Sequence, residues 1–205
     1  MKDAGATETP LSKTELSRQR LLDAAAECFR KEGFHGTSIA RISRAAGMSA
    51  GHIYHFFASK ESIVQAIAER EEHDIANLQQ DLEENVGKDL AEILATHTGK
   101  MIQRSTDPAH ASLTLELAAE ATRNPAVRDI LQQSDREIGS GFQQKVRRMG
   151  APAGIDENKL HVRMQIVVAI MEGLRLRVLC NPGLDLAAVE NEVNNIIHFL
   201  LREPD

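Results

Sequence analysis

The chain has 205 residues, of which 42% are hydrophobic and 3% aromatic, and its formal net charge is −6. This length suits one small and one larger unit, and the apolar content is ample for a buried core. The acidic balance argues against a protein that coats nucleic acid over its whole surface. No apolar run approaches the roughly 18 residues that a membrane span needs, so we expect no membrane partner.

The charge is divided unevenly along the chain. Residues 1–60 carry nine Lys and Arg against six Asp and Glu, a balance of +3, which leaves −9 for the remainder. A basic end on an acidic body can approach phosphates through that end alone.

The two cysteines and the opening segment indicate the cellular compartment in which we expect the protein. Cys28 and Cys180 are far apart and set in helical patterns, which predicts buried thiols in a reducing compartment and no disulfide. The opening MKDAGATETPLSKTE lacks the hydrophobic core of a signal peptide and is expected to be disordered. We therefore expect a cytoplasmic protein.

Residues 37–56, TSIARISRAAGMSAGHIYHF, predict a helix-turn-helix, preceded by an amphipathic helix over residues 13–33. The hydroxyls of Thr37 and Ser38 can cap a helix whose apolar residues recur at three- and four-residue spacing. Gly47 favours the left-handed conformation that often ends a helix, and Ser49 can cap a second short helix over residues 50–55. For this stretch alone, a short helical hairpin in any helical protein is the alternative.

A larger pattern surrounds the helix-turn-helix. It comprises residues 20–25, 29, 33–34, 36–38, 42–43, 46–47, 49, 51, 53–57 and 59–61. In these residues the chain closely resembles the N-terminal domain of tetracycline-repressor-type (TetR/AcrR) transcriptional regulators. The resemblance implies a DNA-binding domain over 13–60 and a regulatory and dimerisation domain over 61–205. It also implies a homodimer that loses its DNA when a small molecule occupies the regulatory domain.

Beyond Ser59 the pattern is helical throughout, without alternating runs or hairpin signals. A fourth helix carries the apolar stripe Ile63, Val64, Ile67, Ile75, Leu78 and Leu82. Further helices are predicted over about 90–107, 110–122, 127–149, 157–179 and 186–202, with a Gly- and Pro-rich loop at 150–154. The predicted fold is all-α: an N-terminal three-helix helix-turn-helix DNA-binding domain plus a larger C-terminal helical ligand-binding and dimerisation domain, with about nine helices.

The predicted DNA-binding face follows from the way a recognition helix enters the major groove, N-terminus first. Members of the resembled family often carry a longer polar residue where this chain has Ala50, so direct readout falls to His52 and His55. The resemblance assigns Tyr54 to a phosphate; a core aromatic is the alternative. The predicted DNA-binding residues are Thr37, Ser38, Arg41, Ser49, Ala50, Gly51, His52, Tyr54, His55 and Lys60, with Lys60, Thr37 and Arg41 on phosphates.

The last helix carries an apolar stripe close to a heptad seam, formed by Val189, Val193, Ile196, Ile197 and Leu200. Its partner helix holds Ala169 and Gly173, small residues that permit close approach. Both helices could cover the core of one subunit. The resemblance instead implies an intersubunit four-helix bundle, and we expect these five residues at a dimer interface.

A cavity between helices is the predicted effector site, because such sites combine apolar walls with a few polar groups. The candidates are Met101, Glu116, Glu120, Phe142, Met171 and Arg175. Two glutamates suit a cationic ligand. A regulator without a ligand is the alternative, and a body filled without a cavity would favour it.

An enzyme is the remaining alternative. The polar groups that could converge in the body are His97, His110, Glu116, Glu120 and His161, and none has the spacing of metal ligands or of a nucleophile motif. We therefore predict no catalytic residue, no metal and no cofactor. The sequence predicts a homodimeric repressor that binds a palindromic operator in double-stranded DNA and that a small-molecule effector releases.

Overall fold

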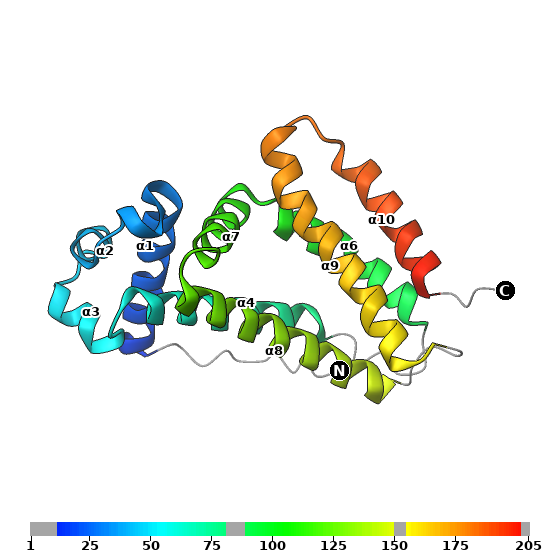
Figure 1. The fold of residues 1–205 in the computed structure, drawn as a ribbon, viewed down its shortest axis with the longest axis horizontal. Helices are drawn as coiled ribbons and strands as arrows, with labels where there is room; N and C mark the ends of the chain where they lie inside the picture. Colours follow the sequence, from blue (N-terminus) through cyan, green and yellow to red (C-terminus); the bar gives the residue numbers. More distant parts are fainter. Residues whose placement is uncertain (1–11, 81–88, 150–154, 202–205) are drawn as a thin grey trace, which may run out of the picture. The chain divides into compact units, whose positions relative to one another are not determined.

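The computed structural model describes residues 12–80, 89–149 and 155–201, and this part of the chain is helical without a strand (Figure 1). It holds nine helices: α1 Lys13–Gly36, α2 Ile39–Ala46, α3 Ala50–Phe56, α4 Lys60–Leu78, α6 Leu90–Thr106, α7 Pro108–Ala121, α8 Pro125–Met149, α9 Glu157–Cys180 and α10 Leu186–Leu201. The all-α prediction is confirmed for these ranges. The opening segment up to residue 11, the loop at 150–154, Leu82 and Arg202 lie outside them.

The chain forms two compact units, Met1–Ile67 and Ala68–Asp205, and passes from one to the other within α4. Our domain bounds of 13–60 and 61–205 divide the same helix at its first residue and remain a prediction.

The core of the N-terminal unit gathers bulky side chains from α1 to α4. Its fully buried members include Leu21, Leu22, Phe29, Ile42, Ile53, Ile63 and Val64. We predicted that α1 ends at Gly33; the backbone does kink there, with a φ of 73°, and α1 then continues to Gly36. A side chain at position 33 would strain this conformation. Beyond the kink, Phe34 packs on Phe29 with ring centroids 5.4 Å apart.

In the C-terminal unit, α6 packs against α9 and α10, and α7 packs against α8 and α9. Figure 1 shows α9 and α10, in yellow to red, side by side. The core of this unit includes Leu94, Ile102, Val167, Met171, Leu174, Val193, Ile197 and Leu201. None of the described helices is both long and apolar enough to cross a bilayer.

Most of the predicted dimer seam belongs to this core instead. Val193 and Ile197 are only 3% and 2% exposed, and they pack in one cluster with residues of α6 and α9. Val189 and Leu200 pack against the same cluster. Ile196 alone of the five is exposed, at 37%. The chain itself therefore covers these four side chains, and their place at a dimer interface remains a prediction.

The two cysteines also differ from each other. Cys28 is buried, as predicted, whereas Cys180 is exposed at the end of α9. The prediction of two buried thiols was therefore wrong for Cys180.

Candidate functional site

The helix-turn-helix is built from local caps. The Ser38 hydroxyl accepts a hydrogen bond from the Arg41 N–H at 3.1 Å and begins α2. Gly47 ends α2 in the left-handed conformation, with a φ of 65°, and the Ser49 hydroxyl accepts from the His52 N–H at 3.2 Å to begin α3. Since Ile53 of α3 is fully buried, the caps and this side chain together hold α3 in place.

The outer face of α3 is open to solvent. Ala50, Gly51, His52, Tyr54 and His55 are all exposed, Tyr54 at 57%. The two imidazoles pack edge-on against the Phe56 ring, at centroid distances of 5.2 Å for His52 and 5.4 Å for His55. A Cβ at Gly51 would meet nothing within 4 Å. The structure thus brings the predicted base-reading residues together on one face, whose role in DNA binding remains a prediction.

The predicted phosphate contacts have different surroundings. Thr37 is 1% exposed and its hydroxyl donates to the Gly33 carbonyl at 2.8 Å, so this hydroxyl has no open path to a phosphate. Arg41 lies at the surface, where the Glu32 carboxylate accepts from its Nε at 2.6 Å and raises the pKa of the guanidinium.

Lys60 has structural partners. Its ammonium donates to the carbonyls of Phe34 at 2.6 Å and Thr37 at 2.9 Å, and it lies 4.3 Å from the centroid of the Phe34 ring. Lys60 therefore ties the start of α4 to the connection between α1 and α2. A direct phosphate contact by Lys60 stays a prediction, and its test must separate it from this role.

The C-terminal unit contains a cleft of about 910 Å³. It is lined by Asp74, Asn77 and Leu78 of α4, by Lys100, Gln103, Arg104 and Thr106 of α6, and by Asp107 and His110 at the start of α7. Sequence reasoning did not select these residues for an effector site, although His110 was considered for the enzyme alternative. The available signal was that Lys100, Gln103 and Arg104 recur three and four positions apart and so share one helix face.

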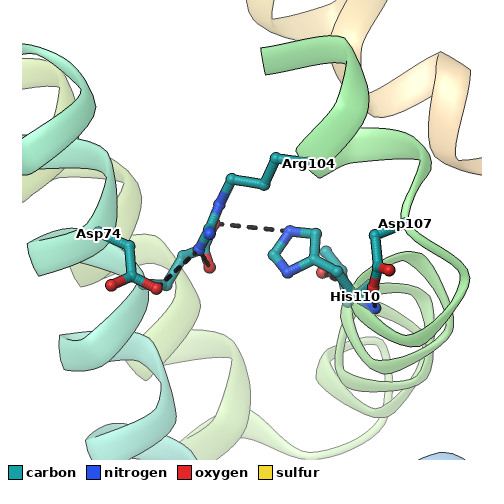
Figure 2. Close-up of polar contacts among 6 residues, drawn as sticks. Asp74, Arg104, Asp107 and His110 are labelled. Carbon is teal, nitrogen blue, oxygen red and sulfur yellow. Dashed lines mark hydrogen bonds and ion pairs between the residues drawn. The ribbon is translucent and has the colours of Figure 1, made fainter. Parts of the chain in front are cut away.

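An ion-pair network lies beside the cleft (Figure 2). Arg104 of α6 donates from Nε to Glu71 of α4 at 3.3 Å, forms a second bond from Nη2 to the same carboxylate, and donates to Asp74 at 3.1 Å. Burial alone would lower the pKa of Arg104, but the bonds and charges of these two carboxylates outweigh it and raise the pKa. The network fastens α4 to α6.

The His110 Nε2 lies 3.6 Å from the Glu71 carboxylate. Figure 2 labels His110 and Arg104. Burial is the main cause that lowers the pKa of His110. The positive charges of Arg104 and Arg175 lower it further, and the carboxylates of Glu71 and Asp107 oppose them.

A second contact holds the end of α4. The Lys145 ammonium of α8 donates to the Ala76 carbonyl at 2.9 Å. The C-terminal half of α4 is therefore held from both α6 and α8.

The six predicted pocket residues do not surround this cleft. Met101, Phe142 and Met171 belong to the apolar core or pack against it, and Glu116 lies half-buried on α7. Glu120 is fully buried, but it pairs with the Arg123 guanidinium at 2.8 Å and accepts from the Asn124 amide at 3.1 Å. Arg175 of α9 is partly buried near His110. Across the three described ranges, no group of three or more His, Cys, Asp or Glu side chains is arranged to hold a metal ion.

Two family models match the chain. The one described as bacterial regulatory proteins of the tetR family matches residues 21–67, and the one described as a tetracyclin repressor-like C-terminal domain matches residues 88–202. The transcriptional regulator UidR of Escherichia coli strain K12 is 31% identical over 133 residues, which are 64% of this chain and 65% of that relative. The aligned region thus spans slightly less than two thirds of UidR.

Solved structures share the fold. Salmonella enterica GusR has a TM-score of 0.74 at 25% identity, over 94% of this chain and 99% of that chain. FadR from Bacillus subtilis, solved in complex with stearoyl-CoA, has a TM-score of 0.71 at 21% identity, over 91% and 99% of the two chains. This second likeness shows the fold alone.

The family matches cover both units. The first includes the helix-turn-helix with its exposed α3 face, and the second covers more than half of the chain and includes α6 to α10. The chain therefore belongs to the tetR family of bacterial regulatory proteins, which are DNA-binding regulators of transcription and not enzymes.

Proposed function

We propose that this regulator is a homodimeric repressor that leaves a palindromic operator when a small-molecule effector occupies the cleft at α4, α6 and α7. The observation that carries the proposal is the path of α4. This helix begins at Lys60, which is bonded to the α1–α2 connection, and its last turn lines the cleft with Asn77 and Leu78. An effector that contacts this turn acts on the same helix that supports the helix-turn-helix.

The exposed face of α3 supports the DNA-binding part of the proposal. His52 and His55 project hydrogen-bonding imidazoles beside two residues with little or no side chain, Ala50 and Gly51. A helix with small residues at its N-terminus can approach base edges closely, and its imidazoles can then bond to acceptors in the major groove. Tyr54, exposed on the same helix, is the proposed phosphate donor. Such a role places the protein with the chromosome in the cytoplasm.

An exposed apolar surface supports the homodimer. On α10 it comprises Ile196 and Phe199, and Phe199 is 79% exposed; on α9 it comprises Val162, Ile166 and Leu176, which are 59%, 44% and 54% exposed. Gly173 lies along the same stripe of α9, and a Cβ there would meet nothing within 4 Å. Exposed apolar side chains at helical spacing, such as Val162, Ile166 and Leu176 of α9, favour an interaction surface. Two copies would bury it as a four-helix bundle with two-fold symmetry.

The proposal is tested at the DNA upstream of the protein's own gene. We expect the purified protein to protect a palindrome whose half-sites lie one helical turn or a multiple apart, since two heads of a symmetric dimer must reach one face of the duplex. One dimer should bind each palindrome at fixed salt concentration. Protection of a site without two-fold symmetry, or binding by a single chain with full affinity, would contradict the homodimeric mechanism.

A further inference from the structure

We propose that the effector is a small, polar anion, and that its acidic group competes with Glu71 and Asp74 of α4 for Arg104. This inference rests on the proposed effector-released function and names the chemical class of the effector. Its structural basis is the set of hydrogen-bonding needs that the cleft leaves unmet.

The unpartnered groups in and beside the cleft are donors. Lys100 lines the cleft, and its ammonium makes no hydrogen bond or ion pair with any residue that the structure describes. His110 also lines it; its buried Nε2 makes no hydrogen bond with a described residue and lies 3.6 Å from the Glu71 carboxylate. Behind it, the buried Nε of Arg175 likewise has no acceptor in the described part of the chain. A buried donor without an acceptor is costly, which applies to the two buried nitrogens, whereas Lys100 is exposed and attracts an anion through its charge. Together these groups favour a ligand that supplies acceptor oxygens.

Each of the three carboxylates around the cleft already accepts a hydrogen bond. Asp74 accepts from Arg104 at 3.1 Å, Glu71 accepts from the same guanidinium, and Asp107 accepts from the His110 backbone N–H at 2.8 Å. A cationic ligand that replaced Arg104 at Glu71 and Asp74 would leave the guanidinium, half-buried, without compensation. An anion can form an ion pair with Lys100 and can accept hydrogen bonds from Arg104 in place of a carboxylate of α4.

The other residues that line the cleft indicate the polarity of the uncharged part of the ligand. Asn77 and Gln103 present amide groups, whereas the Thr106 hydroxyl donates to the Ile102 carbonyl at 2.8 Å. Leu78 is the one aliphatic residue among the nine described residues that line the cleft. Amides both donate and accept, and hydroxyl groups do the same. The cleft therefore suits a molecule with several hydroxyl groups and excludes a hydrocarbon chain as the main contact.

Competition for Arg104 gives the anion a regulatory effect. Arg104 bridges α6 to two of the acidic residues of α4, Glu71 and Asp74. When an anion accepts some of the hydrogen bonds that the Arg104 guanidinium donates, α4 loses contacts to α6. The hydrogen bond that α4 accepts from Lys145 of α8 is unaffected. Because the effector then binds one arrangement of α4 better than the other, it shifts the population between them.

The experiment uses three six-carbon probes that differ in charge at one end: gluconate, glucitol and glucamine. Each is titrated into the full-length protein at pH 7.5 and constant ionic strength, with binding followed by calorimetry. We expect gluconate to bind and glucitol and glucamine not to bind. Lys100→Gln should weaken gluconate binding about tenfold, the effect of one charged hydrogen bond. Lys159→Gln, at an exposed lysine of α9 away from the cleft lining, is the control.

A second pair of variants tests the competition itself. Asp74→Asn and Asp107→Asn each remove one negative charge from the cleft lining, but Asp74 alone bonds to Arg104. We expect Asp74→Asn to tighten gluconate binding several-fold more than Asp107→Asn does. Equal effects would overturn the competition. The inference as a whole is overturned if no probe binds, if glucitol or glucamine binds as well as gluconate, or if Lys100→Gln has no effect.

Operator binding is measured on the same protein without probes. If the operator is bound and gluconate is not, the anionic effector is refuted and the DNA-binding proposal stands. If the operator is not bound, the proposed function fails whatever the probes do.

Discussion

Replacing Lys60 by Met tests whether this residue holds the DNA-binding unit together or contacts DNA. The change keeps the aliphatic stem and removes two hydrogen bonds, to the carbonyls of Phe34 and Thr37. A hydrogen bond to a charged group contributes about 1.5–3 kcal/mol when it is buried. Since both bonds here are only part-buried, we expect the pair to contribute about 2–3 kcal/mol to the free energy of unfolding.

The assay for this prediction uses the single tyrosine. The chain has no tryptophan, so the fluorescence of Tyr54 in α3 reports on the N-terminal unit during urea unfolding. Lys31→Met is the control, because the Lys31 ammonium pairs with Glu27 at the surface at 2.7 Å with 64% of its side chain exposed. An exposed pair of this kind contributes at most about 1 kcal/mol.

The salt dependence of operator binding separates the two roles of Lys60. A lost phosphate contact lowers the slope of log K against log salt by about 0.9. We expect Lys60→Met to destabilise the unit and to leave this slope within about 0.3 of the wild-type value. An unchanged free energy of unfolding together with a slope smaller by about 0.9 would refute the structural role and restore the phosphate contact.

Three further predictions follow from the described surfaces. His52→Ala should relax base preference at one position per half-site, at a cost of about 1–3 kcal/mol; unchanged preference in a randomised operator library would assign readout to His55 or to DNA shape. Phe199→Glu should yield a folded monomer by sedimentation, whereas Val193→Glu should unfold the C-terminal unit because Val193 is 3% exposed; a dimeric Phe199→Glu protein would place the interface elsewhere. Because the pKa of His110 is lowered in the folded state, the unfolded chain takes up more protons below about pH 6.5. Wild-type stability should therefore fall relative to His110→Asn as the pH decreases from 7.5 to 5.5, and a pH-independent difference between their urea midpoints would contradict this.

The helix-turn-helix could be predicted because its determinants are local. Ser38 and Ser49 cap the helices that follow them directly, and Gly47 is the residue that the left-handed turn requires. Ile42 of α2 and Ile53 of α3 each belong to a helical apolar pattern, and both are fully buried. Each of these inferences depends on residues within one or two turns of each other, where periodicity and capping carry the information.

The partner of α10 could not be predicted in the same way. A burial stripe shows that a face is covered, but it does not say whether the same chain or a second copy covers it. Here Val193 and Ile197 pack against α6 and α9 of the same chain. Phe199 was missed because it lies off that stripe, where an apolar residue becomes informative only once its exposure is known.

The cleft was missed for a related reason. Its central contact joins Arg104 to Glu71, 33 positions apart in sequence. Charged residues on a helix face usually signal solvent, and no local pattern tells which of them meets a carboxylate on another helix. Such pairings depend on tertiary packing.

The continuity of α4 makes it a lever arm. At 1.5 Å per residue, its 19 residues extend over about 28 Å. A tilt of about 5° with one end held would displace the other end by about 2.4 Å over that length. A displacement of this size exceeds the range of a few tenths of an ångström within which hydrogen bonds keep their strength. Under the proposed function, a small change in how Arg104 shares its donors would therefore alter hydrogen bonds at the other end of the same helix.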